Sequence, residues 1–546
     1  MEVYDYIIVG AGSAGCVLAN RLSEDPASRV LLIEAGPSDR GIWVRVPLGV
    51  GRILNDERYV WRADTEPERE LHGNRISWPS GRLLGGSSSV NGMLFVRGHP
   101  RRYDAWAAAG CPGWSFDDVL PYLKKVEDCR FGDPAQRGTG GPIGITKLAA
   151  DPITASFLRA CNEAGIASTD DYNDRHAEGA STLQLSTRRG LRCSAAVAYL
   201  RPAARRPNLR VITEALVTHV TFEESRATGV EFVRAGESQV ARARHEVLLC
   251  AGAIRSPQLL ELSGVGDASV LRALGIRVVC HAPGVGENLQ DHLMPRIAFE
   301  CDVPGTVNDL VRDRWRLFAA ALRFALRRDG LFATPSLTAL AYARTQPALP
   351  YPDVRLQIGL MSGTNRLSTD RDSGLDSHSG FHLGGYFIYP ESRGRLHAHS
   401  RDARVAPRIE PHYLSSERDR AVTLAVMKLM RRIAAQPALR KHIVREVRPG
   451  DAAQTDEELL DYARRTGQTC WHPTGTCRMG SDAQAVVDPE LRVRGVDGLR
   501  VVDASVMPFL VASNTNAPTL MLAERAADLI RRAARERRPV RERAAA

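Results

Sequence analysis

The first 34 residues predict an α/β fold that begins with a strand–helix–strand unit, and three observations support this prediction. Residues 6–9 (Tyr-Ile-Ile-Val) form a short, mostly β-branched apolar run that is typical of a buried strand. Residues 16–22 follow a helical pattern of apolar positions, and residues 30–33 form a second apolar run. A strand, a helix and a strand in this order favour a parallel sheet covered by helices.

The turn between the first strand and the helix is glycine-rich and fits the pyrophosphate of a dinucleotide. It reads Gly10-Ala11-Gly12-Ser13-Ala14-Gly15. Gly10 allows the tight turn, Gly12 lets a phosphate approach the backbone, and Gly15 lets the helix pack on the strand. The helix N-terminus adds N–H groups and a positive dipole end. Glu34, at the end of the second strand, is placed to accept hydrogen bonds from a ribose, so we predict dinucleotide binding, with FAD and NAD both open at this point.

Composition narrows the class of protein. The chain has 546 residues, of which 44% are hydrophobic and 25% charged, as in globular proteins. No apolar stretch approaches the roughly 20 residues of a membrane-spanning helix, and no export signal precedes the first strand. The ten cysteines show no regular pairing. We therefore expect a cytoplasmic protein.

Half of the net charge of +10 lies at the C-terminus. Residues 531–546 contain seven arginines and two glutamates, a net charge of +5, and have no apolar face. We interpret this segment as the solvated end of a terminal helix, with contact to an acidic partner or a membrane surface as the alternative. No zinc-finger spacing or other nucleic-acid module occurs, so we expect no nucleic-acid partner.

Further sequence blocks follow in order along the chain, at residues 81–93, 252–257 with 262–266, 283–292, 471–480, 501–505 and 514–519. The first has paired glycines and serines (Gly-Gly-Ser-Ser-Ser), whose amides and hydroxyls suit phosphates and a flavin edge. The block at 471–480 reads Trp-His-Pro-Thr-Gly-Thr-Cys-Arg-Met-Gly. Together the blocks resemble the signatures of the glucose–methanol–choline oxidoreductase family, and this resemblance selects FAD as the cofactor.

The resemblance implies an α/β architecture with a Rossmann-like FAD-binding domain and a discontinuous α+β substrate-binding domain built on an antiparallel sheet. The FAD-binding domain is expected from residues 1–155, 205–295 and 460–546. The substrate-binding domain is expected from residues 156–204 and 296–459.

The expected chemistry is alcohol oxidation, which needs a hydride acceptor that no side chain supplies. The resemblance places His472 as the base that takes the hydroxyl proton while N5 of FAD accepts the hydride, and the near-neutral pKa of histidine suits this role. It places a second active-site residue at Asn516, whose amide is expected to hold the substrate oxygen; Asn514 is the alternative register. Cys470, His472 and Cys477 do not complete a four-ligand zinc site, so no metal is expected.

The resemblance also assigns residues to the cofactor. Some relatives attach FAD through a histidine at the position of Val90, and because valine cannot form that bond we expect noncovalent FAD. Val217 is expected to meet the adenine through its backbone, and Thr515 the isoalloxazine. Asp503 and Ala504 are expected near the flavin or the ribityl chain. The full expected set is Gly10, Gly12, Ser13, Ala14, Gly15, Glu34, Gly85, Gly86, Ser87, Val90, Asn91, Val217, Asp503, Ala504 and Thr515.

We predict the oxidation of a primary alcohol, aliphatic or aryl, to the aldehyde, with oxygen or a quinone-type compound as the electron acceptor. A dehydrogenase is favoured over an oxidase. The alternatives are a hydroxynitrile lyase or a light-driven fatty-acid decarboxylase on the same scaffold, and choline dehydrogenase itself. The low aromatic content of 6% indicates no distinct cage for a quaternary ammonium group. The sequence does not indicate an oligomeric state.

Residues 312–328 combine helically spaced apolar side chains with several arginines. Packing of this helix on the domain core, with extended arginine side chains, is favoured over contact with a membrane surface.

Overall fold

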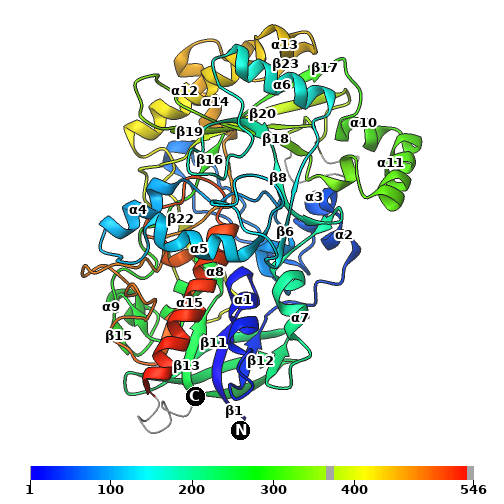
Figure 1. Cartoon of the computed structure of the whole chain (residues 1–546). Helices are drawn as coiled ribbons and strands as arrows, with labels where there is room; N and C mark the ends of the chain where they lie inside the picture. Colours follow the sequence, from blue (N-terminus) through cyan, green and yellow to red (C-terminus); the bar gives the residue numbers. More distant parts are fainter. Residues whose placement is uncertain (1, 365–373, 538–546) are drawn as a thin grey trace.

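The computed structural model describes residues 2–364 and 374–537. Residues 365–373, within the predicted substrate-binding domain, and residues 538–546, within the predicted basic tail, lie outside the described residues. Figure 1 shows two halves, each built around one large sheet.

The first sheet is seven-stranded and draws its strands from distant parts of the chain. Its parallel part runs in the order β10-β2-β1-β13-β25, and an antiparallel meander, β13-β12-β11, extends the other end of β13. The bounds are β1 Val3–Val9, β2 Val30–Ile33, β10 Leu209–Ile212, β11 Ala215–Glu223, β12 Arg226–Arg234, β13 Glu237–Leu249 and β25 Leu499–Val501. The two apolar runs near the N-terminus are thus neighbouring parallel strands, as the sequence predicts.

Helices cover this sheet, and two of them lie side by side although they come from opposite ends of the chain (Figure 1). They are α1 (Ser13–Leu22) and α15 (Asn516–Arg537). Small and apolar residues of both helices are buried in the core of the first sheet. Other helices of this half are α4 (Pro100–Ala108), α5 (Phe116–Val126), α8 (Gly252–Leu262) and α9 (Ala268–Ala273).

The second sheet is six-stranded and entirely antiparallel, in the order β23-β17-β20-β19-β18-β7. Its bounds are β7 Gly179–Thr182, β17 Arg296–Cys301, β18 Leu337–Ala343, β19 Val354–Gly359, β20 Gly380–Phe387 and β23 Ile443–Arg448. Helices α6 (Pro152–Glu163), α12 (Glu417–Ala434), α13 (Pro437–Arg440) and α14 (Asp456–Thr466) belong to this half. The predicted fold class, a parallel nucleotide-binding type of sheet joined to an antiparallel α+β unit, is confirmed.

The predicted domain boundaries at 155 and 460 fall inside helices α6 and α14. Ile153 and Phe157 of α6, and Leu459 of α14, are all buried in the core of the second sheet. Boundaries before Pro152 and after Thr466 would keep each helix whole.

The helix predicted within residues 312–328 is present as α11 (Arg314–Arg327), preceded by α10 (Val307–Arg312). The expectation that its apolar positions pack on the core is wrong for most of them: Trp315, Phe318 and Leu326 are exposed. The helix is held instead by Phe324, which is buried in a small cluster with Val46 and Phe332. Within the described residues, no helix is both long enough and apolar enough to cross a bilayer.

Candidate active site

One cavity is lined by residues from both sheets. At one end the cavity is lined by Val9 and Glu34, at the carboxyl ends of β1 and β2, and by Val217 of β11. At the other end it meets Leu337, Arg355 and Tyr386 of β18, β19 and β20. The cavity therefore joins the predicted nucleotide site to the predicted substrate-binding domain.

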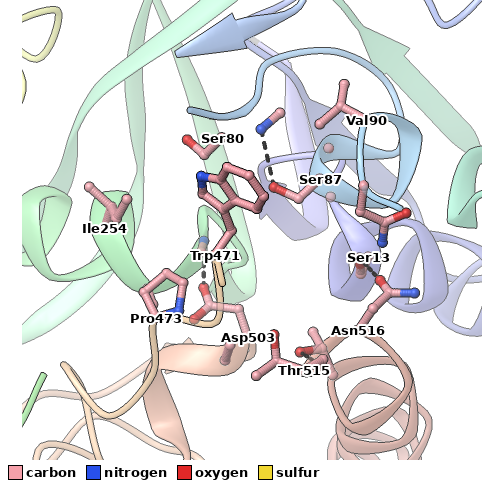
Figure 2. A pocket seen from close by; sticks show the side chains of 18 of the residues that line it. Ser13, Ser80, Ser87, Val90, Ile254, Trp471, Pro473, Asp503, Thr515 and Asn516 are labelled. Atoms are coloured by element: carbon pink, nitrogen blue, oxygen red, sulfur yellow. Dashed lines mark hydrogen bonds between the residues drawn. The ribbon is translucent and has the colours of Figure 1, made fainter. Parts of the chain in front are cut away.

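Three helices begin at the first end of the cavity. Ser13 opens α1, Gly252 opens α8 and Asn516 opens α15, and all three residues line the cavity. The Ser13 hydroxyl donates to Oδ1 of Asn516 at 2.7 Å, which ties the starts of α1 and α15 together (Figure 2). Helix N-termini carry free N–H groups and partial positive charge, so this end suits phosphate groups.

The glycines of the first turn differ in what surrounds them. Gly10 has a φ of +96°, and a Cβ there would lie 2.7 Å from the carbonyl oxygen of Cys250. At Gly15 a Cβ would lie 1.9 Å from the Gly10 oxygen, because the helix packs directly against the turn. A Cβ at Gly12 would meet nothing closer than the Cys250 oxygen at 3.7 Å, so this position opens onto the cavity.

Two buried carboxylates, Glu34 and Asp503, line the cavity and hold the surrounding backbone. Glu34 accepts from the N–H groups of Ala11 and Gly36, each at 2.9 Å, and burial raises the pKa of Glu34 to about 7. Asp503 accepts from the Gly252 N–H at 2.9 Å, and burial raises its pKa as well. Both side chains thus fix loops around the cavity.

Most residues predicted to contact the cofactor line this one cavity, and several of them face it in Figure 2. Two do not line it. Gly15 packs against Gly10, and Gly85 donates its N–H to the Ala11 oxygen at 2.7 Å, so both support the turn from behind. Those that line it are Gly10, Gly12, Ser13, Ala14, Glu34, Gly86, Ser87, Val90, Asn91, Val217, Asp503, Ala504 and Thr515.

His472 lies at the other end of the cavity, on a loop held by Asp291. One carboxylate oxygen of Asp291 accepts from the His472 backbone N–H at 2.8 Å, and the other accepts from the hydroxyls of Thr469, at 2.5 Å, and Tyr413. Burial raises the pKa of Asp291 to about 6, although these hydrogen bonds act in the opposite direction. Trp471, directly before His472, has a φ of 58°, so the loop includes a strained residue next to the candidate base.

The amide beside His472 belongs to Asn514. Its Nδ2 lies 2.9 Å from Nε2 of His472. Asn516, which the sequence analysis pairs with His472, instead accepts a hydrogen bond from Ser13 at the start of α15. The hydrogen bonds thus place Asn514, the alternative register, beside His472, because residue 514 precedes the helix and contacts Arg355 of β19, whereas residue 516 belongs to the helix start. The active-site role of Asn516 stays a prediction.

Arg355 determines which way the Asn514 amide points, and through it the tautomer of His472. A guanidinium can only donate, and Nη1 of Arg355 lies 2.7 Å from Oδ1 of Asn514. The Asn514 NH₂ group must therefore face His472 and donate to Nε2, which acts as an acceptor. The proton of a neutral His472 is then on Nδ1.

His292 continues this chain of hydrogen bonds. Its Nδ1 lies 3.0 Å from Nδ1 of His472 and its Nε2 lies 3.3 Å from the Ile388 oxygen. His472 donates through Nδ1–H, so Nδ1 of His292 accepts and Nε2–H points to the carbonyl. Burial, with the charge of Arg355 adding to it, lowers the pKa of His292 to about 3. A neutral His292 thus leaves the lone pair of His472 on Nε2.

Sequence reasoning did not assign Arg355 or His292 to the site. His292 ends the block at 283–292, so its position in a signature was a usable signal. Arg355 lies in a buried strand without a motif. Its side chain is 1% exposed and donates to Tyr386 Oη at 2.6 Å and Ser513 Oγ at 2.8 Å. Its Nε is buried with no hydrogen-bond partner among the described residues.

Known proteins resemble this chain over most of its length. Residues 4–294 and 390–523 match the N- and C-terminal sequence profiles of the GMC oxidoreductases. The chain is 43% identical to human mitochondrial choline dehydrogenase, over 97% of this chain and 90% of that protein. It is 39% identical to alcohol dehydrogenase [acceptor] of Pseudomonas putida, over 97% and 96%. The crystal structure of pyridoxine 4-oxidase from Mesorbium loti superposes with a TM-score of 0.87, at 31% identity, over 97% of this chain and 99% of that one.

The fold joins a parallel sheet, with a glycine-rich turn and helix starts at the cavity, to an antiparallel unit, and a buried histidine lines the same cavity. The chain belongs to the GMC oxidoreductase family, as the matches over most of its length show. GMC oxidoreductases are FAD-binding flavoproteins, and the prediction of an FAD-dependent oxidoreductase that acts on CH–OH donors is confirmed. The cytoplasmic location stays a prediction.

Proposed function

We propose that this protein oxidises a primary alcohol, aliphatic or aryl, to the aldehyde, with His472 as the base. The observation that carries the proposal is the chain of hydrogen bonds from Arg355 through Asn514 to His472, which leaves an acceptor nitrogen in the cavity. When bound, FAD supplies at N5 the hydride acceptor that no side chain provides.

Residues of the chain then bind the substrate hydroxyl group and accept its proton. The substrate O–H donates to Nε2 of His472 and takes the place of the Asn514 amide, which donates instead to the substrate oxygen. Nε2 receives the proton as the C–H bond breaks. The resulting imidazolium keeps its Nδ1–H on His292, and the Asp291 carboxylate fixes the loop.

The cofactor end fits a dinucleotide because it combines an open position at Gly12 with the three helix starts. We propose that the pyrophosphate lies at Gly12 and Ser13, the ribose at Glu34 and the adenine at Val217. The flavin is proposed to lie near Val90, Asp503 and Thr515. Val90 is buried and lines the cavity, and its aliphatic side chain supports noncovalent binding.

Arg355 argues against choline as the substrate, although several relatives are named choline dehydrogenases. Among the described residues, the carboxylates that line the cavity are Glu34 and Asp503, and both hold the backbone of the nucleotide-binding half. The guanidinium of Arg355 is permanently charged and has no carboxylate partner in the described part of the chain. A cationic substrate would meet like charge in a buried site, so we propose uncharged alcohols.

The test is anaerobic addition of a panel of alcohols to the purified flavoprotein. Bleaching of the flavin absorbance by primary alcohols, with the aldehyde as product, is the expected result. No bleaching by any alcohol would refute the proposal and favour the hydroxynitrile lyase or decarboxylase alternatives, which are assayed directly with cyanohydrins and with fatty acids under light. Reoxidation by air or by a soluble quinone then identifies the electron acceptor, for which we propose a quinone-type compound.

A further inference from the structure

Helix α11 has apolar residues on two opposite sides. Successive residues turn by about 100° around a helix, so residues 320, 321 and 324 share one side. This inner side contains Phe324, buried with Val46 and Phe332, and two partly buried alanines. The opposite side carries apolar residues spaced three or four positions apart, and all of them are exposed: Trp315, Phe318, Ala319, Leu322, Ala325 and Leu326.

The large members of this second set, here called the outer face, are unusually accessible. Trp315 is 79% exposed, Phe318 60%, Leu322 47% and Leu326 76%. In Figure 1 α11 projects from the side of the molecule near α2 (Ile42–Arg45). Ile42 of α2 is 71% exposed, and its neighbour Val46 packs in the same cluster as Phe324. Clustered exposed side chains of this size mark an interaction surface.

The charge around the outer face points to an anionic partner. Residues 312–329 include six arginines and two aspartates, a net charge of +4. Arg316, Arg323 and Arg327 follow one edge of the outer face at helical spacing and are exposed. A second copy of this chain would bring two such basic helices together, which like-charge repulsion disfavours. An anionic lipid surface offers both the apolar layer and the opposite charge.

We propose that the outer face of α11, with Ile42, docks the protein on an anionic lipid surface. Its aromatic and leucine side chains enter the boundary between headgroups and acyl chains, while the flanking arginines meet lipid phosphates. The segments that hold this surface continue into the cavity wall: Leu54 follows α2, and Leu337 follows α11.

The experiment is co-sedimentation of the holoenzyme with vesicles of phosphatidylcholine alone and of phosphatidylcholine with an equal part of phosphatidylglycerol. The wild type is expected to bind the anionic vesicles, and the double variant Trp315→Glu/Phe318→Glu is expected to bind them at least about tenfold more weakly. The matched control is Val444→Glu, because Val444 is 53% exposed on β23 in the same half. This control should bind like the wild type.

A second pair of variants tests the charge. Arg316→Gln/Arg327→Gln should lose most of the preference for anionic vesicles, whereas Arg404→Gln/Arg445→Gln, at exposed arginines elsewhere, should keep it. Flavin content, melting temperature and oxidation of a water-soluble alcohol with a soluble dye should stay the same in all variants. Three results would overturn the proposal: no vesicle binding by the wild type, equal losses in the control variants, or self-association through Trp315 without vesicle binding.

Discussion

The two ends of the cavity are built in different ways. The end proposed to bind the nucleotide is mostly backbone: glycines at 10 and 12, three helix starts, and carboxylates that accept from N–H groups. The end proposed to bind the substrate is a network of side chains, in which Arg355, Asn514, His472 and His292 come from four separate segments. Damage to the first end should therefore affect cofactor retention, and damage to the second should affect the rate with the cofactor still bound.

The largest effect is expected at His472. His472→Ala should slow reduction of the flavin by alcohol at least about 10²-fold and leave FAD bound, because it removes the proton acceptor but no cofactor contact at the nucleotide end. Anaerobic stopped-flow absorbance measures both quantities. His219→Ala, at a partly exposed histidine on β11, is the control. An unchanged rate of flavin reduction in His472→Ala would show that His472 is not the base.

Substitutions at the glycines should give the opposite pattern. Gly12→Val is expected to fold but to purify with little FAD, because its side chain finds room only where the pyrophosphate should lie. Gly15→Val is expected to prevent folding, since its Cβ would overlap the Gly10 oxygen. Flavin-to-protein absorbance ratios and circular dichroism distinguish the two. A Gly12→Val protein with a full flavin complement would contradict the proposal that the pyrophosphate lies at Gly12.

Asn514 and Asn516 allow a direct comparison of the two ends. Asn514→Ala should reduce the rate of flavin reduction about tenfold or more and retain FAD, because Asn514 contacts His472. Asn516→Ala should mainly weaken FAD retention, because its partner is Ser13. Reduction rates and FAD dissociation constants, measured on both variants, test which of the two asparagines acts with His472. Equal effects of the two substitutions on the rate of flavin reduction would argue against separate roles for Asn514 and Asn516.

Arg355 should control charge selectivity. The wild type is expected to prefer the neutral isostere of choline, with a tert-butyl group in place of trimethylammonium, by at least about tenfold in kcat/KM. Arg355→Gln should narrow this preference, because the buried positive charge is gone, and should slow both reactions, because Asn514 loses a charge-assisted hydrogen bond. A wild type that prefers choline would refute this role.

The smallest effect concerns stability and pH. His292 has a folded-state pKa of about 3 against an ordinary value of 6.5, so its contribution to stability is present above pH 6.5 and is lost as the pH falls toward 3. Between about pH 7 and pH 5 the wild type should lose on the order of 2 kcal/mol that His292→Asn does not lose. Melting temperatures of both proteins across this range measure the difference. Parallel curves would show that His292 titrates normally.

The strand, turn and helix at the proposed nucleotide end could be predicted from the sequence because they are local. Strand, turn and helix follow one another within residues 3–22, and each glycine has a reason that can be read in place. The antiparallel sheet and the role of His472 were predicted from the family resemblance. For the partner of His472 the sequence left residues 516 and 514 as alternatives, with 516 preferred, and only the fold shows which of them lies beside His472.

Arg355 could not be predicted at all. It occupies a buried strand position where an apolar residue is the ordinary expectation. The outward orientation of α11 was also beyond the sequence, because both of its sides are apolar and nothing local decides which one packs.

The hydrogen bond between Ser13 and Asn516 joins residues 503 positions apart, and this separation has a consequence for biosynthesis. Asp503, Thr515 and Asn516 form part of the cavity wall, so a growing chain carries the glycine turn long before it carries the residues that enclose a flavin. The proposed flavin site is therefore complete only after nearly all of the chain has left the ribosome. Nascent chains stalled before Asp503 should therefore carry no flavin.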